Sequence, residues 1–245
     1  MLRNFLDNIE ERILSNNKLK KFHPLHDALD TFLYSKNTQT LNAPFVRDSI
    51  DLKRTMIIVV LALLPSLIFG TYNVGLQSPD NTSTSFIDCF IYGLYQVLPM
   101  YLVVFAAGGL CEALFAVVRK HEINEGFLVT GFLIPLTMPP TVPLWMLALS
   151  TVFGVVIGKE IFGGTGYNIF NPALTARAFL FFAYPSKMSG NVPWIFPADG
   201  LSKATPLLET SSNSTLSYSW SDMFFGFIPG SIGETSTVAV LVGAL

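Results

Sequence analysis

The sequence contains few charged side chains, and this scarcity sets its class. Only 13% of its 245 residues are charged, whereas soluble domains carry about 25%. Apolar residues make up 51% of the chain, and 21 of its residues are phenylalanine. This composition excludes an ordinary soluble domain and predicts an all-α integral membrane protein, a polytopic bundle with several membrane-crossing helices. The formal net charge of −2 argues against a nucleic-acid partner.

Cysteine and histidine are also scarce, and the sequence predicts no metal site. Cys89 and Cys111 lie in or beside one apolar segment, without a CxxC motif, so we expect them to be small core residues. His23 and His26 flank Pro24 without further ligands nearby. That arrangement favours surface histidines over a metal-binding pair.

A secretory signal is missing, because no apolar core follows Met1. Residues 1–52 are polar overall, and we expect them to form a cytoplasmic N-terminal extension. Apolar residues in its first part fall on one helical face, and a lysine cluster at 18–21 follows. This pattern predicts an amphipathic helix that either lies on the inner leaflet or packs on a partner subunit.

Long apolar segments fill residues 53–185, where we expect a first membrane repeat of about five spans. Basic residues flank the inner ends of the first two spans, which predicts a cytoplasmic N-terminus. Prolines at 135, 139 and 140 predict that the third span is short and broken. The expected spans are Thr55–Tyr72, a segment within Cys89–Val118, Glu125–Met138, Val142–Gly158 and Asn171–Tyr184.

The segments that follow are an extracytoplasmic loop at 186–234 and the start of another membrane helix at 235–245. The helix should begin at Ser236, and it is apolar up to Leu245 without a cap or polar tail. We therefore expect a chain that is truncated at its C-terminal end, inside a membrane helix.

Charged residues inside apolar spans are functional candidates. Glu112 lies near the inner end of the second span, where it could equally form a structural ion pair with Arg119. Arg177 lies near the middle of the fifth span, at a cost of roughly 2.5–3.5 kcal/mol. Its expected partner is Glu112, Glu125, Glu160 or a ligand phosphate, and a buried pair that only orients helices is an equal alternative.

The stretch from Lys159 to Pro185 interrupts the membrane pattern. Three glycines, at 163, 164 and 166, permit positive φ and a close approach to the backbone. Asn171 is a strong N-cap residue and Pro172 suits the first helical position, so a helix should begin there and end near Pro185. Such a glycine-rich entry into a short membrane helix is typical of binding sites in membrane proteins.

The loop at 186–234 is rich in Ser, Thr, Asn and Pro. Loops beyond about 15 residues without structure of their own are usually functional or disordered. Thr205 has no activating neighbour in the sequence, so the residues alone do not identify it as a nucleophile. On this information a solvated linker is the more common outcome.

Several short motifs, in order along nearly the whole chain, resemble one known family: the B subunit of the sodium-translocating NADH:quinone reductases. The related D subunit of the Rnf complex shares part of the pattern, and the N-terminal extension favours the sodium-pump subunit. The motifs are VRDSIDLKR (46–54), RKHEINEGFLVTG (119–131), PPTVPLW (139–145), KEIFGGTGYNIFNPAL (159–174), RAFLFFAYP (177–185) and IPGSIGETSTVAVLVGA (228–244).

This resemblance implies a flavin mononucleotide (FMN) joined through its phosphate to a threonine hydroxyl. The family's attachment motif is typically D-G-x-S-G-A-T, and residues 199–205 read D-G-L-S-K-A-T. The implied attachment residue is Thr205, with Asp199, Ser202 and Ala204 completing the motif. Lys203 replaces the usual glycine, and it could either weaken recognition by the flavin transferase or pair with the flavin phosphate.

The resemblance further implies a non-covalent riboflavin nearer the cytoplasmic side, and Asn168 and Asn171 are candidates for binding it. It implies a fold like that of urea transporters, with two five-helix repeats, in a multi-subunit complex of the bacterial inner membrane. Electrons from NADH, oxidised on another subunit, would pass through the flavins to quinone and drive sodium transport. Glu112, Glu125 and Arg177 are the candidates for coupling charge to ion movement.

Three other functions remain open on the sequence. A D-type subunit of an Rnf complex would share the motifs. A small-solute channel or transporter would show the same broken helices without a redox cofactor. A purely structural assembly subunit would carry neither flavin nor solute.

Overall fold

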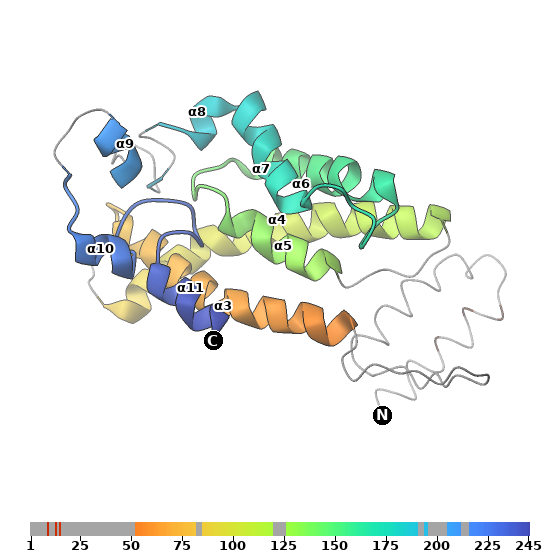
Figure 1. The fold of residues 1–245 in the computed structure, drawn as a ribbon, viewed down its shortest axis with the longest axis horizontal. Helices are drawn as coiled ribbons and strands as arrows, with labels where there is room; N and C mark the ends of the chain where they lie inside the picture. The colour runs from red at the N-terminus through yellow and green to blue at the C-terminus, as the bar shows by residue number, and fades with distance from the viewer. Residues whose placement is uncertain are drawn as a thin grey trace.

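The computed structural model of the chain is helical, and the part that it describes contains no strand. Its helices form a bundle elongated along one axis (Figure 1). The described residues are 9, 13, 15, 52–81, 85–119, 126–190, 194–195, 205–211 and 216–245. Most of the predicted extension at 1–52 therefore lies outside the described residues.

Two long helices form one side of the bundle. Helix α3 covers Leu52–Gln77 and helix α4 covers Phe86–Arg119, and both extend beyond the predicted spans. The two helices cross closely because each has a glycine that lies against the backbone of the other helix. A Cβ added at Gly75 would lie 1.8 Å from the carbonyl oxygen of Cys89, and one added at Gly93 would lie 1.8 Å from that of Thr71. Small residues at membrane-helix contacts permit this approach.

Three shorter helices complete the membrane bundle. Helix α5 covers Gly126–Leu136, α6 covers Leu144–Gly158 and α7 covers Pro172–Ala183. Helix α4 packs against α3, α5 and α6, and α7 packs against α5 and α6. The predicted break after α5 is confirmed, since residues 137–143 are not helical. The predicted start of α7 is confirmed too: Asn171 is its N-cap, and its side chain accepts hydrogen bonds from two backbone amides.

Helices α5 and α7 are too short to cross a membrane alone. Their 11 and 12 residues span roughly 17–18 Å, against a hydrocarbon core of about 30 Å. Within the described residues, three helical stretches are long and apolar enough to cross: Arg54–Gln77, Phe86–Arg119 and Leu144–Phe162. The predicted helix over residues 171–184 is confirmed in its bounds, because Tyr184 ends it and Pro185 begins the next one.

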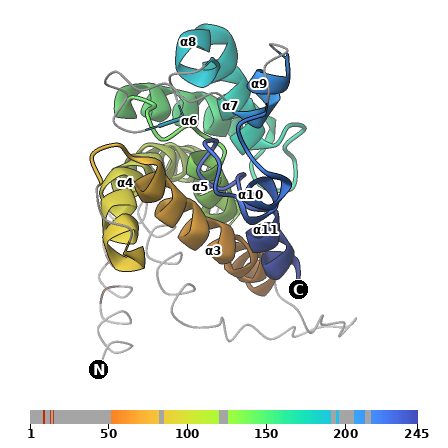
Figure 2. The ribbon, with the colours of Figure 1, turned by 90° about the vertical axis from the view of Figure 1, so that its left-hand side faces the viewer.

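The remaining helices are short. A 3-10 turn covers Glu160–Phe162, and the later short helices are α8 (Pro185–Met188), α9 (Pro206–Ser211), α10 (Trp220–Phe225) and α11 (Thr237–Ala244). Figures 1 and 2 both show α8 and α9 on the side of the bundle away from α3. The expected helix start at Ser236 is confirmed, because the Ser236 side chain caps α11, which packs against α3.

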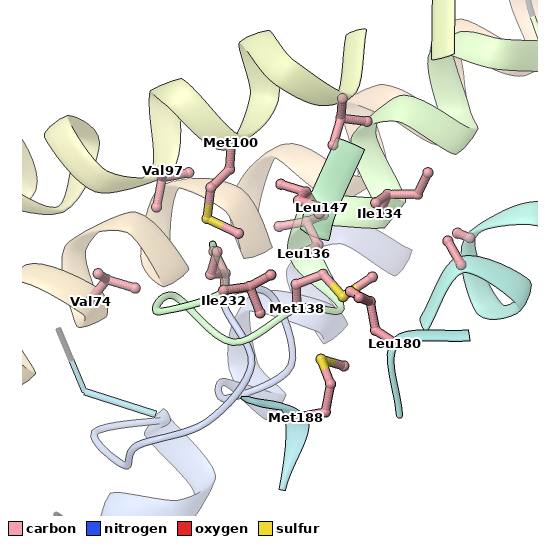
Figure 3. Packing of buried hydrophobic residues seen from close by; sticks show 14 residues of the cluster. Val74, Val97, Met100, Ile134, Leu136, Met138, Leu147, Leu180, Met188 and Ile232 are labelled. Carbon is pink, nitrogen blue, oxygen red and sulfur yellow. The ribbon is translucent and has the colours of Figure 1, made fainter. Parts of the chain in front are cut away.

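The loop before α11 returns to the core at the broken end of α5. The amide of Gly233 donates to the carbonyl of Leu136 at 2.8 Å, and the amide of Ile232 donates to that of Met138 at 3.2 Å. Two non-helical segments thus satisfy each other's backbone groups, as irregular backbone within a membrane must be satisfied. Ile232 is buried in the hydrophobic core, which Figure 3 shows around Met138. The predicted solvated linker is wrong for this part of the loop.

Candidate functional site

A cavity of about 700 Å³ lies where this returning loop meets α7, α8 and α9. Its volume is within the range of small-molecule sites, roughly 300–1,000 Å³. Most of its described lining is apolar or aromatic, including Phe181 and Trp194. Its polar lining residues include the hydroxyl of Thr205, the guanidinium of Arg177 and the carboxylate of Glu234.

Thr205 reaches the cavity because it immediately precedes α9. Its carbonyl accepts hydrogen bonds from the amides of Leu208 at 2.9 Å and Glu209 at 3.0 Å, and its hydroxyl oxygen accepts from Leu208 at 3.4 Å. Pro206 then occupies the first helical position, where a missing amide proton is harmless. Among the described contacts of the hydroxyl there is no general base.

Arg177 is held at the point where three segments converge. Its Nη1 donates to the carbonyl of Thr137, to the hydroxyl of Ser231 at 3.4 Å and to the carboxylate of Glu234 at 3.0 Å. The guanidinium therefore joins α7 to both broken segments. Its side chain remains 31% exposed and that of Glu234 is 50% exposed, so this pair is accessible to solvent or to a ligand.

The predicted protein partners of Arg177 were wrong where they can be judged. Neither Glu112 nor Glu160 forms its ion pair, and Glu125 lies outside the described residues. Sequence reasoning misses Glu234, because this residue lies at the end of the predicted outer loop, only a few residues before the last helix. The backbone pairing of Gly233 with Leu136 brings it back to α7, and no local sequence pattern signals that return.

Glu112 belongs to a separate, buried charge cluster. It pairs with Lys159 at the end of α6, and the two side chains are only 4% and 3% exposed. Lys159 also lies 3.8 Å from the carboxylate of Glu160, which is 1% exposed. Arg119, the expected alternative partner of Glu112, instead donates to the backbone carbonyl of Glu160 and lies over the ring of Phe115.

The buried charges of this cluster are unequal in number. Two carboxylates share one ammonium group, and both carboxylate oxygens of Glu160 are buried without a hydrogen-bond donor among the described residues. Removing one partner from such a buried group is strongly destabilising, because the other charge is left uncompensated. Among the described residues, no group of three His, Cys, Asp or Glu side chains is arranged to hold a metal ion.

The glycine-rich loop has the backbone that its sequence predicts. Gly163, Gly164 and Gly166 have φ values of 124°, 93° and 91°, which side chains other than glycine rarely adopt. Asn168 accepts from the amide of Gly166 at 3.3 Å and donates to the carbonyl of Phe170 at 2.9 Å. The side-chain oxygen Oδ1 of Asn171 accepts from the amide of Ala173 at 2.9 Å as the cap of α7. In these contacts the two asparagines shape the loop itself.

The candidate residues therefore lie in separate parts of the structure. Thr205 and Arg177 line one cavity, and Glu112 lies in the cluster with Lys159. The loop that carries Asn168 and Asn171 lies toward the opposite end of the long axis from α9 (Figure 1). All residues of the proposed attachment motif before Thr205, which are 199–204 and include Asp199, Ser202, Lys203 and Ala204, lie outside the described residues.

Comparison with known proteins gives matches along almost the whole chain. Residues 39–245 match the sequence family described as "NQR2, RnfD, RnfE family". A protein of Chromohalobacter salexigens, named as the B subunit of a Na(+)-translocating NADH-quinone reductase, is 47% identical over 270 residues, covering 99% of this chain and 66% of its own length. Proteins with that name from Pseudomonas aeruginosa and Yersinia pestis are 46% and 45% identical, each over 99% of this chain. The chain thus spans about two thirds of the length of these relatives, 66–68%.

Proposed function

The chain belongs to the NQR2, RnfD, RnfE family, and from this premise we propose that it is the FMN-carrying membrane subunit of a redox-driven sodium pump. In this proposal FMN is bound covalently, by an ester between its phosphate and the hydroxyl of Thr205. NADH is oxidised on another subunit, and electrons pass through flavins to quinone. The names of the three relatives, each the B subunit of a sodium-translocating NADH-quinone reductase, support this function over an Rnf-type one.

The observation that carries the proposal is the position of Thr205 on the wall of the cavity. FMN combines a flat, largely apolar ring system with an anionic phosphate. The cavity offers apolar and aromatic walls together with a guanidinium, and its volume of about 700 Å³ suits a cofactor of that size. The described residues therefore fit the group.

When bound, FMN supplies reversible uptake and release of electrons, while the protein sets its position and potential. Thr205 would hold the phosphate covalently, and its carbonyl, bonded into α9, fixes the backbone there. Phe181 and Trp194 would exclude water from part of the cavity. A flavin transferase would make the ester bond from a flavin dinucleotide: the Thr205 oxygen would displace a nucleoside monophosphate from the flavin-side phosphorus, and the hydroxyl proton would pass to solvent.

The second flavin belongs, in this proposal, to the glycine-rich loop. Non-covalent riboflavin would bind near Asn168 and Asn171, toward the opposite end of the long axis from α9 (Figure 1). The positive-φ glycines there leave the backbone open to a close approach, since a Cβ at Gly166 would meet no atom within 4 Å. Glu112, Glu125 and Arg177 are the proposed residues that couple flavin charge to sodium movement.

We place the subunit in a bacterial inner membrane, with its N-terminus in the cytoplasm and Thr205 on the periplasmic side. The three long apolar helices support a multi-pass protein. Many large apolar side chains on their outer surfaces, such as Leu110 and Leu114, are exposed and suit lipid or neighbouring subunits. The proposed partners are the other subunits of the complex, quinone and the flavin transferase.

In-gel flavin fluorescence of the denatured subunit, produced with a flavin transferase, tests the proposal. A wild-type band that fluoresces, and a Thr205→Ala band that does not, are the expected results. Thr210→Ala is the matched control: Thr210 lies in α9, just after Thr205, its hydroxyl donates to the carbonyl of Pro206 in its own turn, and it is absent from the cavity lining. Fluorescence that persists in Thr205→Ala would move the attachment elsewhere, and a dark wild type would favour the channel without a redox cofactor.

A further inference from the structure

Arg177 and Glu234 are the only charged residues among the described lining of the cavity. They pair with each other at 3.0 Å, but both are partly exposed, at 31% and 50%. Exposed ion pairs of this kind contribute little to the free energy of folding, since solvent screens the charges and both side chains lose conformational freedom. The pair can therefore open at little cost when a stronger anion enters the cavity.

Arg177 is nevertheless well positioned without Glu234. The carbonyl of Thr137 and the hydroxyl of Ser231 also accept from its Nη1, so the guanidinium stays anchored to both broken segments. Every one of its described hydrogen bonds uses Nη1. The donors on Nε and Nη2 make no such bond within the described chain, and two nitrogens of one guanidinium match the oxygens of a phosphate.

We propose that Arg177 is the phosphate-binding residue of this cavity and that Glu234 occupies it only until the flavin phosphate arrives. The proposal rests on the proposed attachment of FMN at Thr205. Arg177 exchanges the Glu234 carboxylate for the phosphate, and so positions that phosphate at the Thr205 hydroxyl. It is a positioning residue, and it acts by binding the phosphate whether or not the ester has formed.

The test uses the full-length subunit in detergent with Thr205→Ala, in which no ester can form. FMN and riboflavin, which differ only in the phosphate, are titrated separately by fluorescence. We expect FMN to bind about tenfold more tightly or better, the size of one charge-assisted hydrogen bond. Adding Arg177→Gln should remove this preference for FMN and leave riboflavin binding unchanged. With Arg177 present, added salt should weaken the preference for FMN. Lys187→Gln is the matched control, an exposed cation on α8 that does not line the cavity.

Glu234→Gln provides a second measurement that retains Arg177. It removes the competing carboxylate, so FMN should bind several-fold more tightly while riboflavin binding stays the same. This variant keeps the test decisive if Arg177→Gln lowers the melting temperature of the subunit. FMN affinity that does not change in Glu234→Gln would overturn the exchange.

Two further outcomes would overturn the proposal: an FMN preference that survives Arg177→Gln, and one that disappears in Lys203→Gly instead. The attachment itself is read separately, by in-gel fluorescence with Thr205 intact. A dark wild-type band together with an Arg177-dependent FMN preference refutes only the attachment. A fluorescent band together with an Arg177-independent preference refutes only the role of Arg177.

Discussion

Replacing Lys159 by methionine is expected to destabilise the subunit strongly. The ammonium group of Lys159 is the cation that the structure places between Glu112 and Glu160, and all three side chains are at most 4% exposed. Methionine fills a similar volume but carries no charge, so two carboxylates would remain buried together. Breaking a buried ion pair from one side costs about 3–5 kcal/mol.

The size of this cost makes it measurable by thermal unfolding of the purified subunit in detergent. With about 2–4 °C per kcal/mol for a chain of this length, the melting temperature should fall by roughly 6–20 °C. Lys187→Met is the control, because Lys187 is exposed and the same substitution there should change little.

A double variant separates electrostatics from packing. Glu112→Gln removes one of the two carboxylates, so combining it with Lys159→Met should recover part of the loss, and the two effects should be clearly non-additive. A Lys159→Met subunit as stable as wild type would refute the reasoning. A double variant that melts at the sum of the two separate losses would show that packing, rather than charge, explains the effect.

Three further predictions follow from local contacts. Gly93→Ala should cost about 1–3 kcal/mol or more by melting temperature, because its Cβ would lie 1.8 Å from a carbonyl oxygen of α3, whereas Gly109→Ala, with its nearest atom at 3.8 Å, should be tolerated. Asn171→Ala should lower the free energy of unfolding by about 1 kcal/mol through loss of the α7 cap, and it should release non-covalent flavin. Asn171→Asp is the control, because it should retain the cap. Flavin that stays bound in the alanine variant would contradict the riboflavin proposal. The Ser219 hydroxyl and amide lower the pKa of Asp222, so the ionised carboxylate stabilises the start of α10. This stabilisation should be present at neutral pH and lost only as the pH falls below about 4. Amide hydrogen exchange in α10 at pH 7 should therefore be faster in Asp222→Asn, and unchanged exchange would argue against this role of Asp222.

The amino-acid sequence is enough to predict a helical membrane protein and the approximate positions of its main helices. Low charge content and long apolar runs require helices that satisfy their own backbone groups in a membrane. Caps and prolines act within a few residues, so the start of α7 at Pro172, the break after Leu136 and the cap at Ser236 could be predicted. Because these signals are local, they do not predict the full lengths of α3 and α4, which depend on contacts between helices.

Which charges and which segments meet depends instead on how distant parts of the chain pack together. Arg177 is paired with Glu234, and Glu112 with Lys159, across 57 and 47 residues of chain. Neither helical periodicity nor turn chemistry contains information at that separation. The pairing of Gly233 with Leu136 closes the loop over α7. The cavity that joins Thr205 to Arg177 exists only because those distant segments pack together.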